Sequence, residues 1–98
     1  MSITLIADMK IKPGLLDEAL SVIKDEMPEA RAFEGCEYVN VYTAQDDPNR
    51  IVLIESWASE EAFASYDALR TERGDADAFT KYYDGAPSVT KLVATPGF

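Results

Sequence analysis

The chain has 98 residues, 47% of them hydrophobic, and its 18 acidic and 9 basic residues give a formal net charge of −9. These values predict one globular domain over residues 1–98, and the negative charge argues against binding to nucleic acid or to an anionic membrane surface. No stretch approaches the roughly 20 apolar residues of a membrane helix, and residues 2–11 lack the features of a signal peptide. The single cysteine, Cys36, fits a reducing compartment, so we expect a cytoplasmic protein.

The chain contains no histidine. This composition excludes nucleophilic systems of the Ser-His-Asp and Cys-His types, and it excludes zinc or haem held by histidine. The acidic residues show no spacing typical of a calcium-binding loop. We therefore expect a protein without a bound metal or cofactor.

The N-terminal third predicts a strand followed by a helix. Residues 3–11 place apolar side chains at every second position, which is typical of a strand with one buried face. Pro13-Gly14 is expected to end the strand and open a helix, whose apolar stripe repeats at helical spacing. Pro28 is expected to kink or end this helix, although it can resume and reach a C-cap at Gly35. The stripe consists of Leu16, Ala19, Leu20, Ile23 and Met27.

A hairpin is predicted in the middle of the chain. Residues 37–43 alternate between an aliphatic face and an aromatic and polar face that holds Tyr38, Asn40 and Tyr42. Asp47-Pro48-Asn49 is a turn signal, and the apolar run 51–54 indicates a central strand buried on both faces. These two strands are therefore predicted to be antiparallel neighbours in the sheet.

The last part of the chain repeats the pattern of helix and strand. Trp57 lies near the end of the central strand, and Ser59 is a suitable N-cap for a helix that ends near Arg73-Gly74. A second short amphipathic segment covers 75–83, and residues 88–94 alternate as a final strand.

The resulting order β-α-β-β-α-β predicts a four-stranded antiparallel sheet with both helices on one face, a ferredoxin-like α+β fold. The first and third strands are apolar on both sides, so the face without helices is poorly suited to water. We predict a homodimer with the two helix-free faces packed together.

Several motifs resemble the antibiotic biosynthesis monooxygenase domain, a family of the dimeric α+β barrel superfamily. The resemblance covers nearly the whole chain and implies this fold, the dimer and a pocket between sheet and helices. It also implies oxidation of a small aromatic phenol, quinol or anthrone by O₂ without a cofactor. The motifs are Lys12-Pro13-Gly14, Gly35-Cys36, Asp47-Pro48-Asn49-Arg50 and the run from Glu55 through Trp57 and Ser59 to Ala62.

The chain departs from the family at positions where chemistry is usual. Many members have a histidine in the helix after the tryptophan, where this chain has Tyr66. Haem-degrading relatives have an asparagine on the first strand, here Ala7, so haem cleavage is not expected. Some oxygenases of the family place an asparagine four residues before the tryptophan, here Leu53. The complete set of catalytic residues of any one relative is therefore not present in this chain.

Four residues are candidates for the site, and each has two interpretations. Trp57 is either a core anchor or an aromatic wall that stacks the substrate. Tyr66 is either a packing residue or a hydrogen-bond partner of a substrate oxygen, and Asn40 either lines a cavity or faces the dimer partner. Glu55 is either paired with a cation such as Arg50 or is a base whose pKa is raised by burial.

Two other functions fit the same sequence. One is a homodimer that binds a small aromatic ligand without turnover, and the other is an accessory protein beside a larger biosynthetic enzyme. A cavity filled by its own side chains would favour binding without turnover, and an open cavity with a polar group inside would favour an enzyme.

Overall fold

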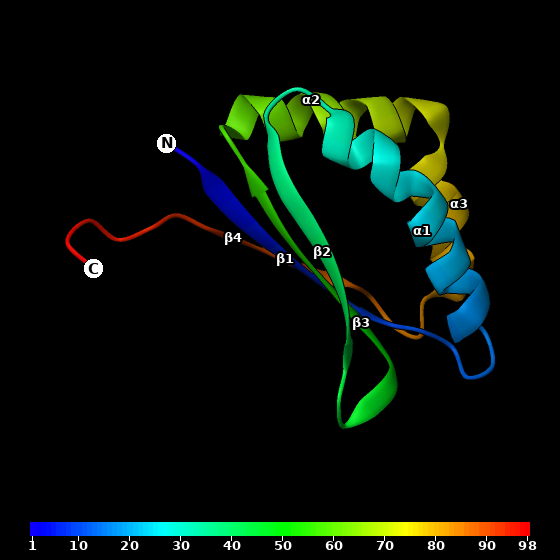
Figure 1. Cartoon of the computed structure of the whole chain (residues 1–98). Coiled ribbons are helices and arrows are strands. Elements are labelled where there is room, and N and C mark those ends of the chain that lie inside the picture. The colour runs from blue at the N-terminus through cyan, green and yellow to red at the C-terminus, as the bar shows by residue number, and fades with distance from the viewer.

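A four-stranded antiparallel sheet with the strand order β2-β3-β1-β4 is the frame of the molecule (Figure 1). The computed structural model describes residues 1–98. The elements are β1 (Ile3–Lys10), α1 (Leu16–Ala32), β2 (Cys36–Ala44), β3 (Asp47–Trp57), α2 (Glu60–Arg73), α3 (Asp75–Phe79), a 3-10 helix (Thr80–Tyr82) and β4 (Ser88–Leu92). The ferredoxin-like α+β fold is confirmed. No helix has the length and apolar content that a membrane crossing requires.

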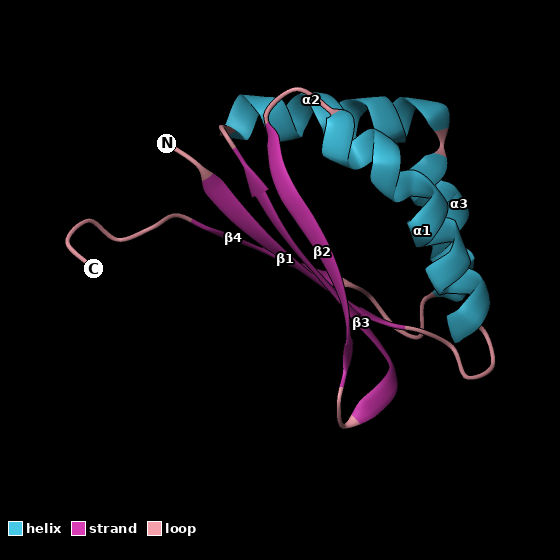
Figure 2. Cartoon of the chain, viewed as in Figure 1, coloured by secondary structure: helices cyan, strands magenta, loops and turns pink.

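All helices cover the same face of the sheet (Figure 2). The side chains of β1 alternate as the sequence predicts: Ile3, Leu5 and Met9 are buried under the helices, and Ile6 and Asp8 belong to the opposite face. β3 lies between β2 and β1, which confirms its prediction as a central strand. The core therefore fills the space between helices and sheet. Its largest fully buried side chains are Trp57, Leu5, Ile11 and Ile51.

The predicted turn at Asp47-Pro48-Asn49 is wrong by a few residues. The hairpin turns at Gln45-Asp46, and Asp47 already pairs with Ala44 as the first residue of β3. The local chemistry is nevertheless that of a turn, since Asp47 Oδ1 accepts a hydrogen bond from the Asn49 amide at 3.0 Å. An irregularity in the register next to Ala44 accommodates Pro48, which cannot donate to the ladder.

The ends of α1 also differ from the prediction. Pro13-Gly14 forms a turn before the helix, with Gly14 at φ +83°, and the helix begins only at Leu16. The helix continues past Pro28 to Ala32, so the expectation that Pro28 could end it is wrong. Phe33, not Gly35, is its C-cap. Gly35 lies at φ +90° in the connection to β2.

Candidate functional site

A small cavity lies between α1, the sheet and the α2–α3 segment. Its volume is about 80 Å³, which is roughly half of the 150 Å³ at which an engineered apolar cavity holds benzene. The wall is mostly apolar, and its charged residues are Glu26, Glu55 and Arg70. The remaining lining residues are Met9, Ile23, Met27, Ala30, Val39, Leu53, Tyr66, Ala76, Phe79 and Tyr83.

Glu55 brings a carboxylate into this wall from β3. It shares the helix-facing side of the strand with Leu53 and Trp57, as its register predicts. Its Oε1 accepts a hydrogen bond from Trp57 Nε1 at 2.9 Å. Burial raises the pKa of Glu55, and the hydrogen bond from Trp57 and the charge of Arg70 oppose this effect.

The predicted pairing of Glu55 with Arg50 is wrong, because the two side chains lie on opposite faces of the sheet. Arg50 instead binds Asp8 on the helix-free face, with Nε to Oδ1 at 2.9 Å and a second bond to Oδ2 at 2.5 Å. The hydrogen bond from Arg50 lowers the pKa of Asp8. Glu55 thus forms no ion pair within the chain, and the indole of Trp57 is its hydrogen-bond partner.

Trp57 and Tyr66 stack in the core beside the cavity. Their ring centroids are 5.1 Å apart with an interplanar angle of 29°. Tyr66 lines the cavity, whereas Trp57 is fully buried behind it and does not. Burial raises the pKa of Tyr66 to about 12, so its hydroxyl stays protonated and can donate a hydrogen bond at neutral pH.

Asn40 lies apart from the other three candidates. It is exposed and pairs with Ile54 on the helix-free face, together with Tyr38 and Tyr42. The structure therefore brings together Glu55, Trp57 and Tyr66 and does not bring Asn40 to the cavity.

Two charged residues of the cavity wall were missed from the sequence. Arg70 lies one helical turn after Tyr66, and its Nη2 donates to Glu26 Oε2 at 3.0 Å across the gap between α2 and α1. The spacing i, i+4 places Tyr66 and Arg70 on one side of α2, which is a signal in the sequence. The pairing with Glu26, 44 residues away, depends on helix packing and has no local signal.

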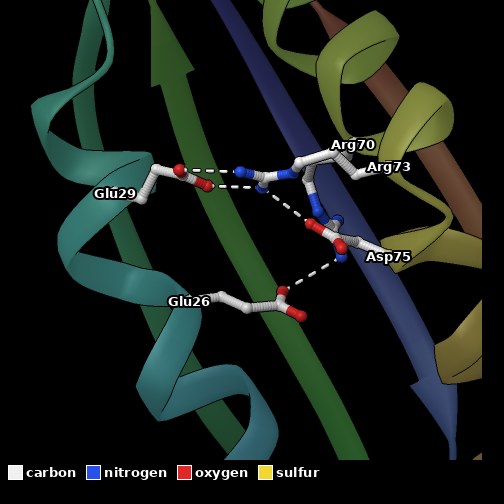
Figure 3. A network of polar contacts seen from close by, with 5 residues as sticks. All are labelled: Glu26, Glu29, Arg70, Arg73 and Asp75. Carbon is white, nitrogen blue, oxygen red and sulfur yellow. Dashed lines mark hydrogen bonds and ion pairs between the residues drawn. The ribbon is translucent and has the colours of Figure 1, made fainter.

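Further ion pairs extend this contact between the helices (Figure 3). Arg73 Nη1 and Nη2 donate to the two carboxylate oxygens of Glu29 at 2.9 and 2.5 Å, and Nη2 also reaches Asp75 at 2.7 Å. Arg73 does not line the cavity. The pairs therefore join α1 to the end of α2 and the start of α3.

No group of three or more Cys, Asp or Glu side chains lies close enough together to hold a metal ion. The polar groups of the residues that line the cavity are the carboxylates of Glu55 and Glu26, the hydroxyls of Tyr66 and Tyr83 and the guanidinium of Arg70. Together they offer two carboxylate acceptors, of which Glu26 is already bonded to Arg70, and two kinds of donor in an apolar surrounding.

Solved structures with this fold share the arrangement of strands and helices. An antibiotic biosynthesis monooxygenase is 22% identical at a TM-score of 0.87, with 96% of this chain and 99% of that chain covered. Rv0793 from Mycobacterium tuberculosis is 18% identical at 0.88, with 97% and 96% covered. A conserved protein from Methanosarcina mazei Go1 is 18% identical at 0.87, with 94% and 91% covered. At these identities the likeness shows the fold.

The fold and the cavity define an α+β protein of the ferredoxin-like class with a pocket between sheet and helices. Residues 2–72 match the family described as Antibiotic biosynthesis monooxygenase. The chain belongs to this family. No curated protein matches its sequence.

Proposed function

We propose that the protein oxidises a small electron-rich aromatic compound, a phenol, quinol or anthrone, with O₂ and without a cofactor. The observation that supports the proposal most is Glu55, a carboxylate with a raised pKa in the wall of an apolar cavity. A base of this kind is suited to remove a proton from a weakly acidic hydroxyl group or activated CH₂ group near neutral pH. The names of the family and of one structural relative describe a monooxygenase, which is the class of reaction proposed here.

In this proposal Glu55 accepts the proton, and the substrate anion passes an electron to O₂. The oxygen species then joins the substrate carbon, one oxygen atom stays in the product and the other leaves as water. The substrate loses two hydrogen atoms overall, so oxygen and hydrogen balance. The apolar wall keeps water from the anion, and Tyr66 donates a hydrogen bond to the substrate oxygen.

In this proposal Trp57 does not contact the substrate and instead positions the residues that do. It holds the Glu55 carboxylate through Nε1 and supports the ring of Tyr66 by stacking. Asn40 has no part in the reaction, because it lies on the other face of the sheet.

Consumption of oxygen tests the proposal. Purified protein with hydroquinones and anthrones is expected to consume O₂ above the rate in buffer, measured with an oxygen electrode. Glu55→Gln is expected to lower the rate by about 10²–10⁴-fold, the usual contribution of a general base. Glu72→Gln, an exposed carboxylate on the same helix as Tyr66, is the matched control and leaves the rate unchanged. Equal rates with protein and buffer would contradict the proposal.

The volume of the cavity favours a second candidate, a protein that binds a small ligand without turnover. About 80 Å³ is below the roughly 300–1,000 Å³ of most pockets for drug-sized ligands. A ring enters only if the wall moves, and the flexible side chains of Met9 and Met27 permit such a movement. Binding of hydroquinone without oxygen consumption would support this candidate.

We also propose that two copies of the chain pack through their helix-free faces. Ile6, Val52 and Ile54 are only partly covered there, and Tyr38 and Tyr42 are 43% and 48% exposed. An apolar patch of this kind is typical of an interface. The Arg50–Asp8 pair, which joins the start of β3 to the end of β1, places both signs of charge on the face, which a second copy can complement.

A further inference from the structure

Arg70 has a hydrogen-bond donor that the protein does not use. Its Nη2 is bonded to Glu26, but its Nε is a buried side-chain nitrogen without a hydrogen-bond partner. A guanidinium has five N–H donors and accepts no hydrogen bond, so only an acceptor can satisfy it. A buried donor without a partner loses its hydrogen bonds to water and gains none in return, and natural proteins keep few of them.

The charge of Arg70 acts on the polar groups of the cavity. It lowers the pKa of Glu55, Tyr66 and Tyr83, in each case against the larger effect of burial, which raises the pKa. Arg70 therefore favours negative charge at several points around the cavity. Glu26 holds its Nη2 from α1, and Arg70 is one of the residues that line the cavity.

The geometry points to Arg70 as the group that binds the ionised oxygen of the ligand, with Nε–H as the donor and Glu26 as its positioning residue. This inference rests on the proposed function. The O–H bond of the bound phenol breaks, the proton goes to the Glu55 carboxylate, and the electron pair stays on the oxygen. That oxygen then accepts the unused hydrogen bond. Hydrogen bonds between ionised groups are stronger than neutral ones, which favours the anion over the neutral phenol.

Arg73 provides the contrast on the same helix. It also joins α2 to α1, but its donors are taken by Glu29 and Asp75, and it lies outside the cavity. Loss of Arg73 removes an ion pair between the helices without removing a donor from the cavity. It is therefore the matched control for Arg70.

The test uses 4-nitrophenol, whose ionised form absorbs visible light. Binding is followed by the fluorescence of Trp57, the only tryptophan, and ionisation of the bound probe by absorbance over a range of pH. Arg70→Met is expected to raise the apparent pKa of bound 4-nitrophenol by about 1 unit, a tenfold weaker preference for the anion, as loss of a nearby opposite charge does. Arg70→Lys, which keeps the charge but not the Nε donor, is expected to give a smaller rise. Arg73→Met is expected to give none.

Two results would overturn the inference. One is the same apparent pKa in the wild type and in Arg70→Met, and the other is an equal rise in Arg73→Met. Failure of the wild type to bind 4-nitrophenol would contradict it as well. If Arg70→Met does not fold by circular dichroism, the comparison of Arg70→Lys with the wild type decides. The test needs no turnover, so a protein that consumes no O₂ but shows the expected pattern contradicts only the proposed oxidation.

Discussion

Trp57 donates its indole N–H to Glu55 Oε1 at 2.9 Å, from a position two residues further along the same strand. The strand period of two places both side chains under the helices, so the bond forms within one short segment of β3. Glu55 is partly buried and has no ion pair, and this bond is the contact that stabilises its ionised form directly. The tryptophan therefore lowers the pKa of the carboxylate, against the larger effect of burial, in addition to filling the core.

Trp57→Phe is expected to raise the pKa of Glu55 further, because burial is then opposed only by the charge of Arg70. Titration of the carboxyl ¹³C resonance measures this shift. The lost hydrogen bond and the smaller ring are expected to lower the free energy of unfolding by about 2–4 kcal/mol. Phe63→Leu is the control, since Phe63 contacts the Trp57 ring without bonding to Glu55. It is expected to destabilise by about 1 kcal/mol and to leave the titration of Glu55 unchanged.

Glu55→Gln is expected to stabilise the protein at neutral pH. The folded-state pKa of Glu55 is raised above its unfolded value, so the ionised carboxylate lowers stability once the pH rises through the folded-state pKa. The glutamine side chain of the variant is neutral and can still accept the bond from Trp57. The melting temperature of the variant should exceed that of the wild type at pH 8, and the difference should disappear below the ordinary glutamate pKa of about 4.3. A difference that is independent of pH would contradict the prediction.

The sequence predicts the faces of the strands better than the contacts between elements. Alternation along β1 and the shared register of Leu53, Glu55 and Trp57 correctly place these side chains on one side. The same alternation groups Asn40 with Tyr38 and Tyr42, but which face meets the helices depends on pairing with β3. A local pattern contains no information on that pairing.

The charged part of the cavity wall shows the same limit. Arg70 and Glu26 lie 44 residues apart in the chain, on two different helices, and their ion pair depends on how α1 and α2 pack on the sheet. Periodicity gives the apolar face of each helix but not the partner of one charged residue at its edge. A buried donor without a hydrogen-bond partner, such as Arg70 Nε, can be identified only from the three-dimensional structure.

Gly35→Ala is expected to lower the free energy of unfolding by at least about 2 kcal/mol. Gly35 has φ +90°, and a Cβ there would overlap the Cβ of Ala62 in α2. The strain of this backbone conformation costs roughly 1–2 kcal/mol, and the overlap adds to it. Gly74→Ala is the control, because Gly74 has φ +80° but nothing near its absent Cβ. Urea denaturation should show a smaller loss of unfolding free energy for Gly74→Ala than for Gly35→Ala. Adding Ala62→Gly to Gly35→Ala should recover only the part of the loss that is due to overlap of the two Cβ atoms.

Ile54→Lys is expected to dissociate the proposed homodimer. Ile54 pairs with Ile6 of β1 and Asn40 of β2, so it lies in the middle of the helix-free face. A lysine there introduces a charge that a close apolar contact between two copies would have to bury without a partner. Sedimentation velocity is expected to give a dimer for the wild type and a monomer for the variant.

The control for this experiment is Ser21→Lys, which adds the same charge to an exposed position on α1. It is expected to remain dimeric, because α1 lies on the other face of the sheet. Circular dichroism shows whether Ile54→Lys keeps its fold, since Ile54 is only partly buried in the single chain. A wild type that sediments as a monomer would contradict the proposed interface. A folded Ile54→Lys that remains dimeric would place the interface on another surface, since the helix-free face could not then be closed around that charge.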